Sequence, residues 1–171
     1  MLRGNFVTLR QLTISDLEPF TRWHSNEEVT HFLGMKPLSN ESARNLLESY
    51  LDDRNGIYFG ILVKDECKLI GYTYLSNILT SHKVARELGI VIGNPMYWNQ
   101  GYGTEASRLI IDYGFNVLGL HRIELFVLDF NKRARRVYEK LGFVVEGIQR
   151  KARWVNNEWQ DVIMMAKLEN E

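Results

Sequence analysis

The sequence predicts an α+β fold, in which a mixed, mostly antiparallel twisted sheet is flanked by helices. Three observations carry this prediction. Helical patterns are concentrated before residue 53, strand patterns follow one another from residue 57 to residue 92, and two more helical patterns alternate with strand patterns after residue 101. This order is typical of α+β proteins. The length of 171 residues fits a single domain over residues 1–171 with a sizeable core.

One strand and three helices are predicted before the main run of strands. The alternating segment 6–10 predicts a short strand. Each helical segment is bounded by a residue that favours a helix end, and the segments are 17–23 after Ser15, 26–33 before Gly34 and 43–51 after Ser39.

Apolar or alternating segments predict the remaining strands. Segments 57–63 and 69–75 flank the polar stretch Lys64–Lys68, which predicts an antiparallel hairpin. Further strands are expected at 84–92 and 123–128, and a second hairpin joins 144–148 to 159–168 around Asn156-Asn157. Two helices lie between these strands, one with an apolar face from Ala106 to Val117 and one at 135–141 that ends at Gly142.

Gly101 and Gly103 stand immediately before the helical pattern that begins near Ala106. The first turn of a helix has unpaired N–H groups and a positive dipole end, and glycine lets a phosphate approach the backbone closely. A tight turn explains the two glycines equally well. A Walker A loop is excluded because no lysine follows Gly103, and a dinucleotide fingerprint is poor because Arg108 stands near the place of its third glycine.

Two segments resemble one known family. YWNQGYGTEA (residues 97–106) is similar to the acetyl-CoA loop of the GNAT N-acetyltransferases, and NKRARRVYEKLGF (residues 131–143) is similar to a second block that the family shows at this spacing. The likeness covers nearly the whole chain and is nearest to the branch that acetylates ribosomal protein N-termini, with similarity to spermidine N-acetyltransferases. One departure is Trp98, where the family loop usually begins with Gln or Arg.

The resemblance implies a GNAT-like fold and acetyl-CoA as co-substrate. In that fold the strand ending near Ile92 and the strand starting near Ile123 splay apart, and main chain of the first pairs with the pantetheine arm. The residues expected to bind the cofactor are Ile90, Val91, Ile92, Trp98, Asn99, Gln100, Gly101, Tyr102, Gly103, Thr104, Asn131 and Arg136. Arg136 belongs to a basic cluster with Lys132, Arg133 and Arg135 that either holds the 3′-phosphate or forms a solvated helix face.

Direct transfer of an acetyl group needs a neutral amine and a proton for the departing thiolate. The resemblance assigns the general acid to Tyr138, whose phenol has a reference pKa near 10. Several relatives carry Ser where this chain has Ala134, which cannot hold a proton. Glu87 is the candidate base, acting through water. The alternatives are a packing role for Tyr138 and a solvated strand-end position for Glu87.

Other candidates are weaker. A lone histidine is usually a surface or structural residue, which applies to His24, His31, His82 and His121. Glu27 and Glu28 could attract a cationic amine, but acidic residues in a first helical turn usually complement the helix dipole. No His or Cys pair has metal-ligand spacing, so no metal site is expected. Cys67, the single cysteine, lies in a predicted polar turn.

Composition limits the partners. The chain has 21 basic and 21 acidic residues, so nothing indicates a nucleic acid partner. No apolar run approaches the ~20 residues that span a bilayer, and the N-terminus lacks a signal-peptide core, so no membrane partner and a cytoplasmic location are expected.

The predicted function is acetyl transfer to a primary amine, first of all a protein N-terminus of ribosomal-protein type. A polyamine is the alternative acceptor, and a non-catalytic CoA-binding module is a third reading that Asn131 and Tyr138 argue against. A homo-oligomer and a monomer both stay open.

Overall fold

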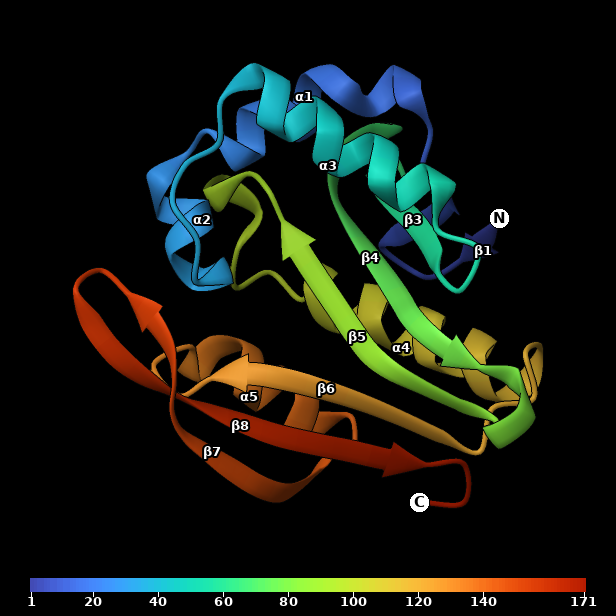
Figure 1. The fold of residues 1–171 in the computed structure, drawn as a ribbon. Coiled ribbons are helices and arrows are strands. Elements are labelled where there is room, and N and C mark those ends of the chain that lie inside the picture. Colours follow the sequence, from blue (N-terminus) through green and yellow to red (C-terminus); the bar gives the residue numbers. More distant parts are fainter.

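The computed structural model describes all 171 residues as one eight-stranded sheet covered by helices (Figure 1). The strand order is β1-β2-β3-β4-β5-β6-β8-β7, and every neighbouring pair is antiparallel except β5 and β6. The strands are β1 (Leu2–Arg3), β2 (Val7–Gln11), β3 (Ile57–Val63), β4 (Lys68–Leu79), β5 (Val84–Ile92), β6 (Arg122–Leu128), β7 (Val144–Val155) and β8 (Glu158–Leu168). The predicted α+β class and mixed sheet are confirmed.

The five α-helices are α1 (Leu17–His24), α2 (Glu27–Leu33), α3 (Asn40–Asp52), α4 (Tyr102–Asn116) and α5 (Lys132–Lys140). The predicted ends of α2 and α3 are confirmed: Gly34 follows α2 in the left-handed conformation, and the Ser39 hydroxyl accepts the Ser42 N–H. The prediction that Ser15 caps α1 is wrong. A short 3₁₀ turn (Ile14–Asp16) precedes this helix, and Asp16 instead accepts the backbone N–H of Thr13 and the guanidinium of Arg10.

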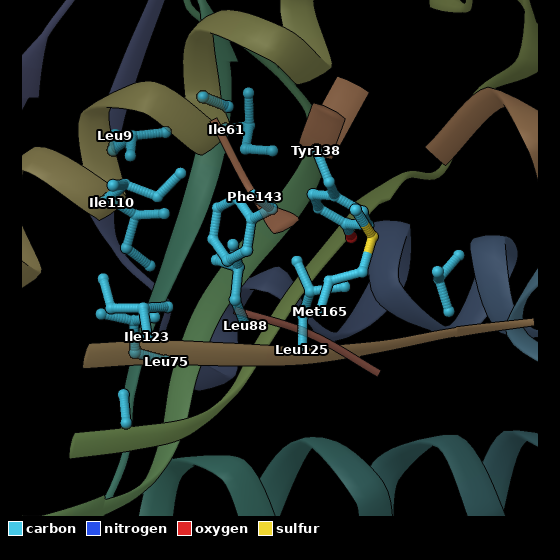
Figure 2. Packing of buried hydrophobic residues seen from close by; sticks show 14 of the residues in the cluster. Leu9, Ile61, Leu75, Leu88, Ile110, Ile123, Leu125, Tyr138, Phe143 and Met165 are labelled. Atoms are coloured by element: carbon cyan, nitrogen blue, oxygen red, sulfur yellow. The ribbon is translucent and has the colours of Figure 1, made fainter. Parts of the chain in front are cut away.

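The sheet lies between two hydrophobic cores. Side chains of α4 and α5 pack with the sheet in the larger core, and Figure 2 shows Ile110, Tyr138 and Phe143 there among strand residues such as Leu125 and Met165. On the other side, Phe20 and Leu47 of α1 and α3 pack against Tyr72 and Val91. No helix in the structure is both long enough and apolar enough to cross a bilayer.

The sheet opens between its two parallel strands. β5 pairs with β6 only at Val84↔Arg122 and Ala85↔Ile123, and beyond this point the two strands diverge (Figure 1). The other edge of β5 is paired with β4 along its length. The splayed central strands expected from the family resemblance are therefore present, and the far half of β5 presents one edge with no strand beside it.

The chain between β6 and β7 differs slightly from the prediction. α5 begins at Lys132 rather than Arg135, because the Asn131 side chain caps it by accepting the Ala134 N–H at 3.1 Å. Asn131 therefore stands at the N-terminal end of the helix that carries Tyr138.

Candidate active site

The loop before α4 presents a row of backbone donors. The N–H groups from Asn99 to Thr104 have no hydrogen-bond partner within the chain, and no side chain caps the helix. Asn99 and Gly101 have φ of 60° and 87°, a left-handed geometry that turns successive amides toward one side. Because α4 adds its positive dipole end at the same place, the loop is suited to bind a diphosphate.

A cavity runs from this loop along β5, and we call it the cofactor cavity. Its walls come from the loop, from β5, from α2 and from the start of α5. The lining residues are Val29, Phe32, Leu33, Ile90, Val91, Ile92, Tyr97, Trp98, Asn99, Gly101, Gly103, Thr104, Asn131, Arg133, Ala134 and Val137. A Cβ on Gly103 would stand 3.6 Å from Ile90 Cδ1, so a larger side chain there would grow into this cavity.

The main chain of β5 offers strand-like hydrogen bonds at the opening. Gly93 N–H donates to Ile70 O at 2.8 Å, and antiparallel ladders alternate, so Val91 and Gly89 direct their backbone groups toward β4. Ile90 and Ile92 direct theirs toward the gap beside β6. The indole N–H of Trp98 confirms this orientation by donating to Ile92 O at 2.7 Å. Val91 lines the cavity with its side chain.

The ring of Trp98 also forms a cation–π contact with the guanidinium of Arg133. The guanidinium of Arg133 lies 3.7 Å from the centre of the Trp98 ring and 4.7 Å from that of Phe32. Arg133 has no carboxylate partner within salt-bridge distance, and it lines the cofactor cavity. The tryptophan that departs from the family loop is thus the platform for an arginine from α5.

Several residues expected to bind the cofactor do not line this cavity with their side chains. Gln100 bonds back to Met96 O, and Tyr102 packs beside Tyr97 at a ring distance of 5.8 Å. Both residues contribute only their backbone N–H groups to the row of free donors from Asn99 to Thr104. Arg136 is exposed and has no ion pair, and it lies outside both cavities. Of the predicted basic cluster, which lies on α5, Arg133 is the member that lines the cofactor cavity.

A second cavity, which we call the acceptor cavity, adjoins the first. The two share Phe32, Leu33, Ile90, Val91, Asn131 and Ala134. The acceptor cavity also contains both predicted catalytic side chains, Glu87 and Tyr138. The splay between β5 and β6 therefore joins a phosphate-binding end to a pocket with a carboxylate and a phenol.

Glu87 lies in the interior of β5 rather than at its start. Its carboxylate accepts hydrogen bonds from the Tyr74 hydroxyl at 3.1 Å and the Ser76 hydroxyl at 3.1 Å, with Asn77 Nδ2 at 3.5 Å. Burial, and next the negative charge of Glu87, raise the pKa of Tyr74, which keeps this phenol a donor. A carboxylate held by donors and open to the cavity can accept a proton from an ammonium through water.

Tyr138 packs in the larger hydrophobic core and also lines the acceptor cavity. Its side chain is 5% exposed, and its ring packs near Phe143 at 5.9 Å (Figure 2). Its hydroxyl has no hydrogen-bond partner in the chain, yet the residue lines the acceptor cavity. Burial raises the pKa of this phenol above its usual value, so it stays protonated.

Asn131 lies where the two cavities meet. Its Oδ1 caps α5, and its Nδ2 donates to Phe32 O at 3.3 Å, which ties α2 to α5. An amide nitrogen has two hydrogens, so one donor remains for a ligand.

The acceptor cavity also contains an aromatic cluster that the sequence did not predict. Tyr50, Tyr72 and Tyr74 line it, with ring distances of 6.0 Å between Tyr50 and Tyr72 and 5.8 Å between Tyr50 and Tyr74. The alternation of Tyr72 and Tyr74 along one strand was the available signal, because residues i and i+2 share a face. His24 completes the cluster: Nε2 lies 3.1 Å from the Tyr72 hydroxyl, and burial lowers its pKa.

The remaining candidates lie elsewhere. His31 contacts Asn156, and His82 and His121 are exposed. Glu27 and Glu28 lie exposed in the first turn of α2 and outside both cavities. Cys67 is exposed in the β3–β4 turn. The structure contains no group of three or more His, Cys, Asp or Glu side chains that could hold a metal ion.

Comparisons with known proteins agree with this geometry. An acetyltransferase (GNAT) domain model matches residues 7–144. The uncharacterized N-acetyltransferase YoaA of Bacillus subtilis is 31% identical over 91% of this chain and 89% of its own. The spermidine N(1)-acetyltransferase of Escherichia coli is 30% identical over 96% and 87%. The structure of spermidine N-acetyltransferase from Vibrio cholerae in complex with CoA and spermine is similar with a TM-score of 0.88, at 28% identity and 98% coverage of both chains.

Proposed function

The chain belongs to the GNAT acetyltransferase family and is an acetyl-CoA-dependent N-acetyltransferase, and from this premise we propose that it acetylates a primary amine bound between Glu87 and Tyr138. The observation that carries the proposal is the meeting of the two cavities at Asn131 and Ala134. One cavity offers phosphate-binding amides, and the other offers a carboxylate and a phenol.

The residues present fit acetyl-CoA. The diphosphate would rest on the N–H groups from Asn99 to Thr104, with the guanidinium of Arg133 beside them. The pantetheine arm would bond to the main chain of Ile90 and to the N–H of Ile92 along the gap beside β6. Asn131 retains one amide hydrogen for a pantetheine carbonyl. Arg136, exposed on α5, is a candidate for the 3′-phosphate outside the cavity.

The catalytic side chains divide the proton transfers. Glu87 accepts the proton of the ammonium group through a water molecule, which leaves a neutral amine to attack the thioester carbonyl. The nitrogen of the tetrahedral adduct gives its second proton to water, and as the adduct collapses the carbon–sulfur bond breaks and Tyr138 gives its proton to the thiolate. Solvent then restores that proton to the phenol. Glu87 passes the proton that it accepted to solvent. No covalent intermediate with the protein is needed, since the amine attacks the thioester directly.

For the acceptor we propose the α-amine of a protein N-terminus of ribosomal-protein type. A second candidate is spermidine or another small amine, and it is favoured by relatives that are named as spermidine acetyltransferases. The tyrosine faces and Glu87 are compatible with either ammonium group, since both are cations that bind carboxylates and aromatic rings.

A thiol-release assay tests the proposal. Purified protein is mixed with acetyl-CoA and, in separate reactions, with N-terminal peptides or with spermidine. We expect amine-dependent release of CoA thiol and an acetylated product by mass spectrometry. Thiol release that does not depend on any added amine, or none at all while acetyl-CoA binds, would refute the proposed acceptor site.

A further inference from the structure

The acceptor cavity contains few charged groups. Glu87 is the one carboxylate among its lining residues, and Arg153 is the one permanently charged cation. Burial lowers the pKa of His24 and raises the pKa of Tyr72 and Tyr74, so these groups are neutral. An acceptor with two ammonium groups would therefore find a carboxylate for one of them and, in this cavity, none for the other.

Other carboxylates on the elements around the acceptor cavity do not belong to its lining. Glu28 is exposed on α2 outside the cavity, Asp129 forms an ion pair with Lys132 at 2.8 Å, and Asp161 accepts the Lys151 N–H at 2.8 Å. None of them lines the cavity. The lining of the acceptor cavity therefore offers no second carboxylate to a remote ammonium group.

An irregularity in β7 brings Arg153 to this cavity. Gln149 pairs with Val162 and Arg153 pairs with Gln160, so residues 150–152 stand opposite Asp161 alone. Lys151 adopts φ of 50° within this bulge. Bulges redirect side chains and are frequent beside active sites. Here Gln149 and Arg153, on either side of the bulge, both line the acceptor cavity.

The tip of the hairpin that carries Arg153 contacts α2. The β7–β8 hairpin reaches past the body of the sheet toward this helix (Figure 1), and Asn156 Nδ2 lies 2.8 Å from His31 Nδ1 at its tip. The Arg153 side chain is exposed and forms no hydrogen bond or ion pair in the chain, whereas Arg122 in β6 bonds to Glu124 and Glu146. A guanidinium that lines a cavity and has no intramolecular carboxylate is available to a ligand.

We infer that Arg153 selects acceptors that carry a carboxylate at the end remote from the reacting amine and disfavours those with a second ammonium group. The inference rests on the proposed acetyl transfer at Glu87 and Tyr138. It specifies which charge the remote end of the acceptor carries. An ω-amino acid such as 6-aminohexanoate and a peptide with an acidic side chain share this chemistry. Spermidine, with cationic groups along its length, does not.

Three amines of similar length isolate the remote charge: 6-aminohexanoate, hexylamine and 1,6-diaminohexane. Initial rates at saturating acetyl-CoA give kcat/KM for each. We expect the carboxylate to be used best and the diamine worst, with about a tenfold range between them, since both Arg153 and Glu87 act on partly screened charges. Peptides that begin Ala-Glu and Ala-Lys repeat the comparison and distinguish a peptide acceptor from a free amino acid.

Charge reversal provides the decisive comparison. Arg153→Glu should invert the order, so that 1,6-diaminohexane becomes the best of the three. Arg150→Glu introduces the same charge change on the same strand but outside the cavity, and it should preserve the wild-type order. Equal use of the three amines by the wild type, or preference for the diamine, would overturn the inference while leaving acetyl transfer intact. No turnover of any amine would instead refute the proposed function.

Discussion

Replacing Tyr138 by Phe removes one oxygen atom from the site and little else. The hydroxyl has no hydrogen-bond partner in the chain, and the ring is 5% exposed beside Phe143. Phenylalanine keeps the ring and its packing, so we expect the free energy of unfolding to change by less than about 0.5 kcal/mol. A loss of activity in Tyr138→Phe would therefore report on the proton and not on folding.

The size of that loss follows from the proposed role. A positioned general acid contributes about 100-fold to 10,000-fold in rate, or about 3 to 5 kcal/mol of barrier. We expect turnover at saturating acetyl-CoA to fall at least tenfold with any accepted amine, where solvent or the ammonium product takes over part of the protonation. Affinity for acetyl-CoA should stay near the wild-type value, because the amides from Asn99 to Thr104 are untouched.

The assay is steady-state thiol release, with acetyl-CoA binding measured by calorimetry. Tyr113→Phe is the matched control, since this tyrosine of α4 lies outside both cavities and its hydroxyl also has no partner in the chain. The control should retain wild-type turnover. If Tyr138→Phe turned over within a factor of about two of the wild type, the phenol would be a packing residue and the general-acid assignment would be wrong.

Three further predictions concern the base, the phosphate site and stability at high pH. Glu87→Gln keeps the size of the side chain and removes its charge. Turnover at neutral pH should fall and the acid limb of the pH–rate profile should change, while calorimetry finds the same acetyl-CoA affinity. An unaltered profile would exclude Glu87 as the base. Gly103→Val adds a Cβ that would stand 3.6 Å from Ile90 Cδ1 and two further carbon atoms at the cofactor cavity. It should weaken acetyl-CoA binding more than tenfold, or about 1.4 kcal/mol, by calorimetry; equal affinity would contradict the placement of the diphosphate on this loop. Burial raises the pKa of Tyr72, Tyr74 and Tyr138 in the folded chain, whereas unfolded tyrosines release their protons near pH 10. The folded state then binds more protons than the unfolded state above about pH 10, so the melting temperature should decline as pH rises through this region, and a constant value from pH 9 to 11 would contradict the burial argument.

Local sequence determined the elements that lie around the site. The apolar run at 84–92 forms β5 with the predicted bounds, and Gly101 has the left-handed backbone that places free amides at the start of α4. Helix ends at Gly34 and Ser39 also followed from the sequence. These features depend on interactions between residues close in sequence, such as caps and turn geometry, or on apolar periodicity. They could therefore be predicted without knowing which strands are neighbours.

Long-range contacts decided the chemistry of the cavities. Arg133 was one of several basic residues on a predicted helix, and only its stacking on Trp98 distinguishes it from exposed Arg136. Glu87 acquires its hydrogen bonds from β4, since Ser76 is its partner in the antiparallel register. Arg153 reaches the acceptor cavity because β7 bulges against β8. Strand register, helix stacking and bulges join residues far apart in the chain, and hydrophobic patterning does not specify which polar side chains they bring together.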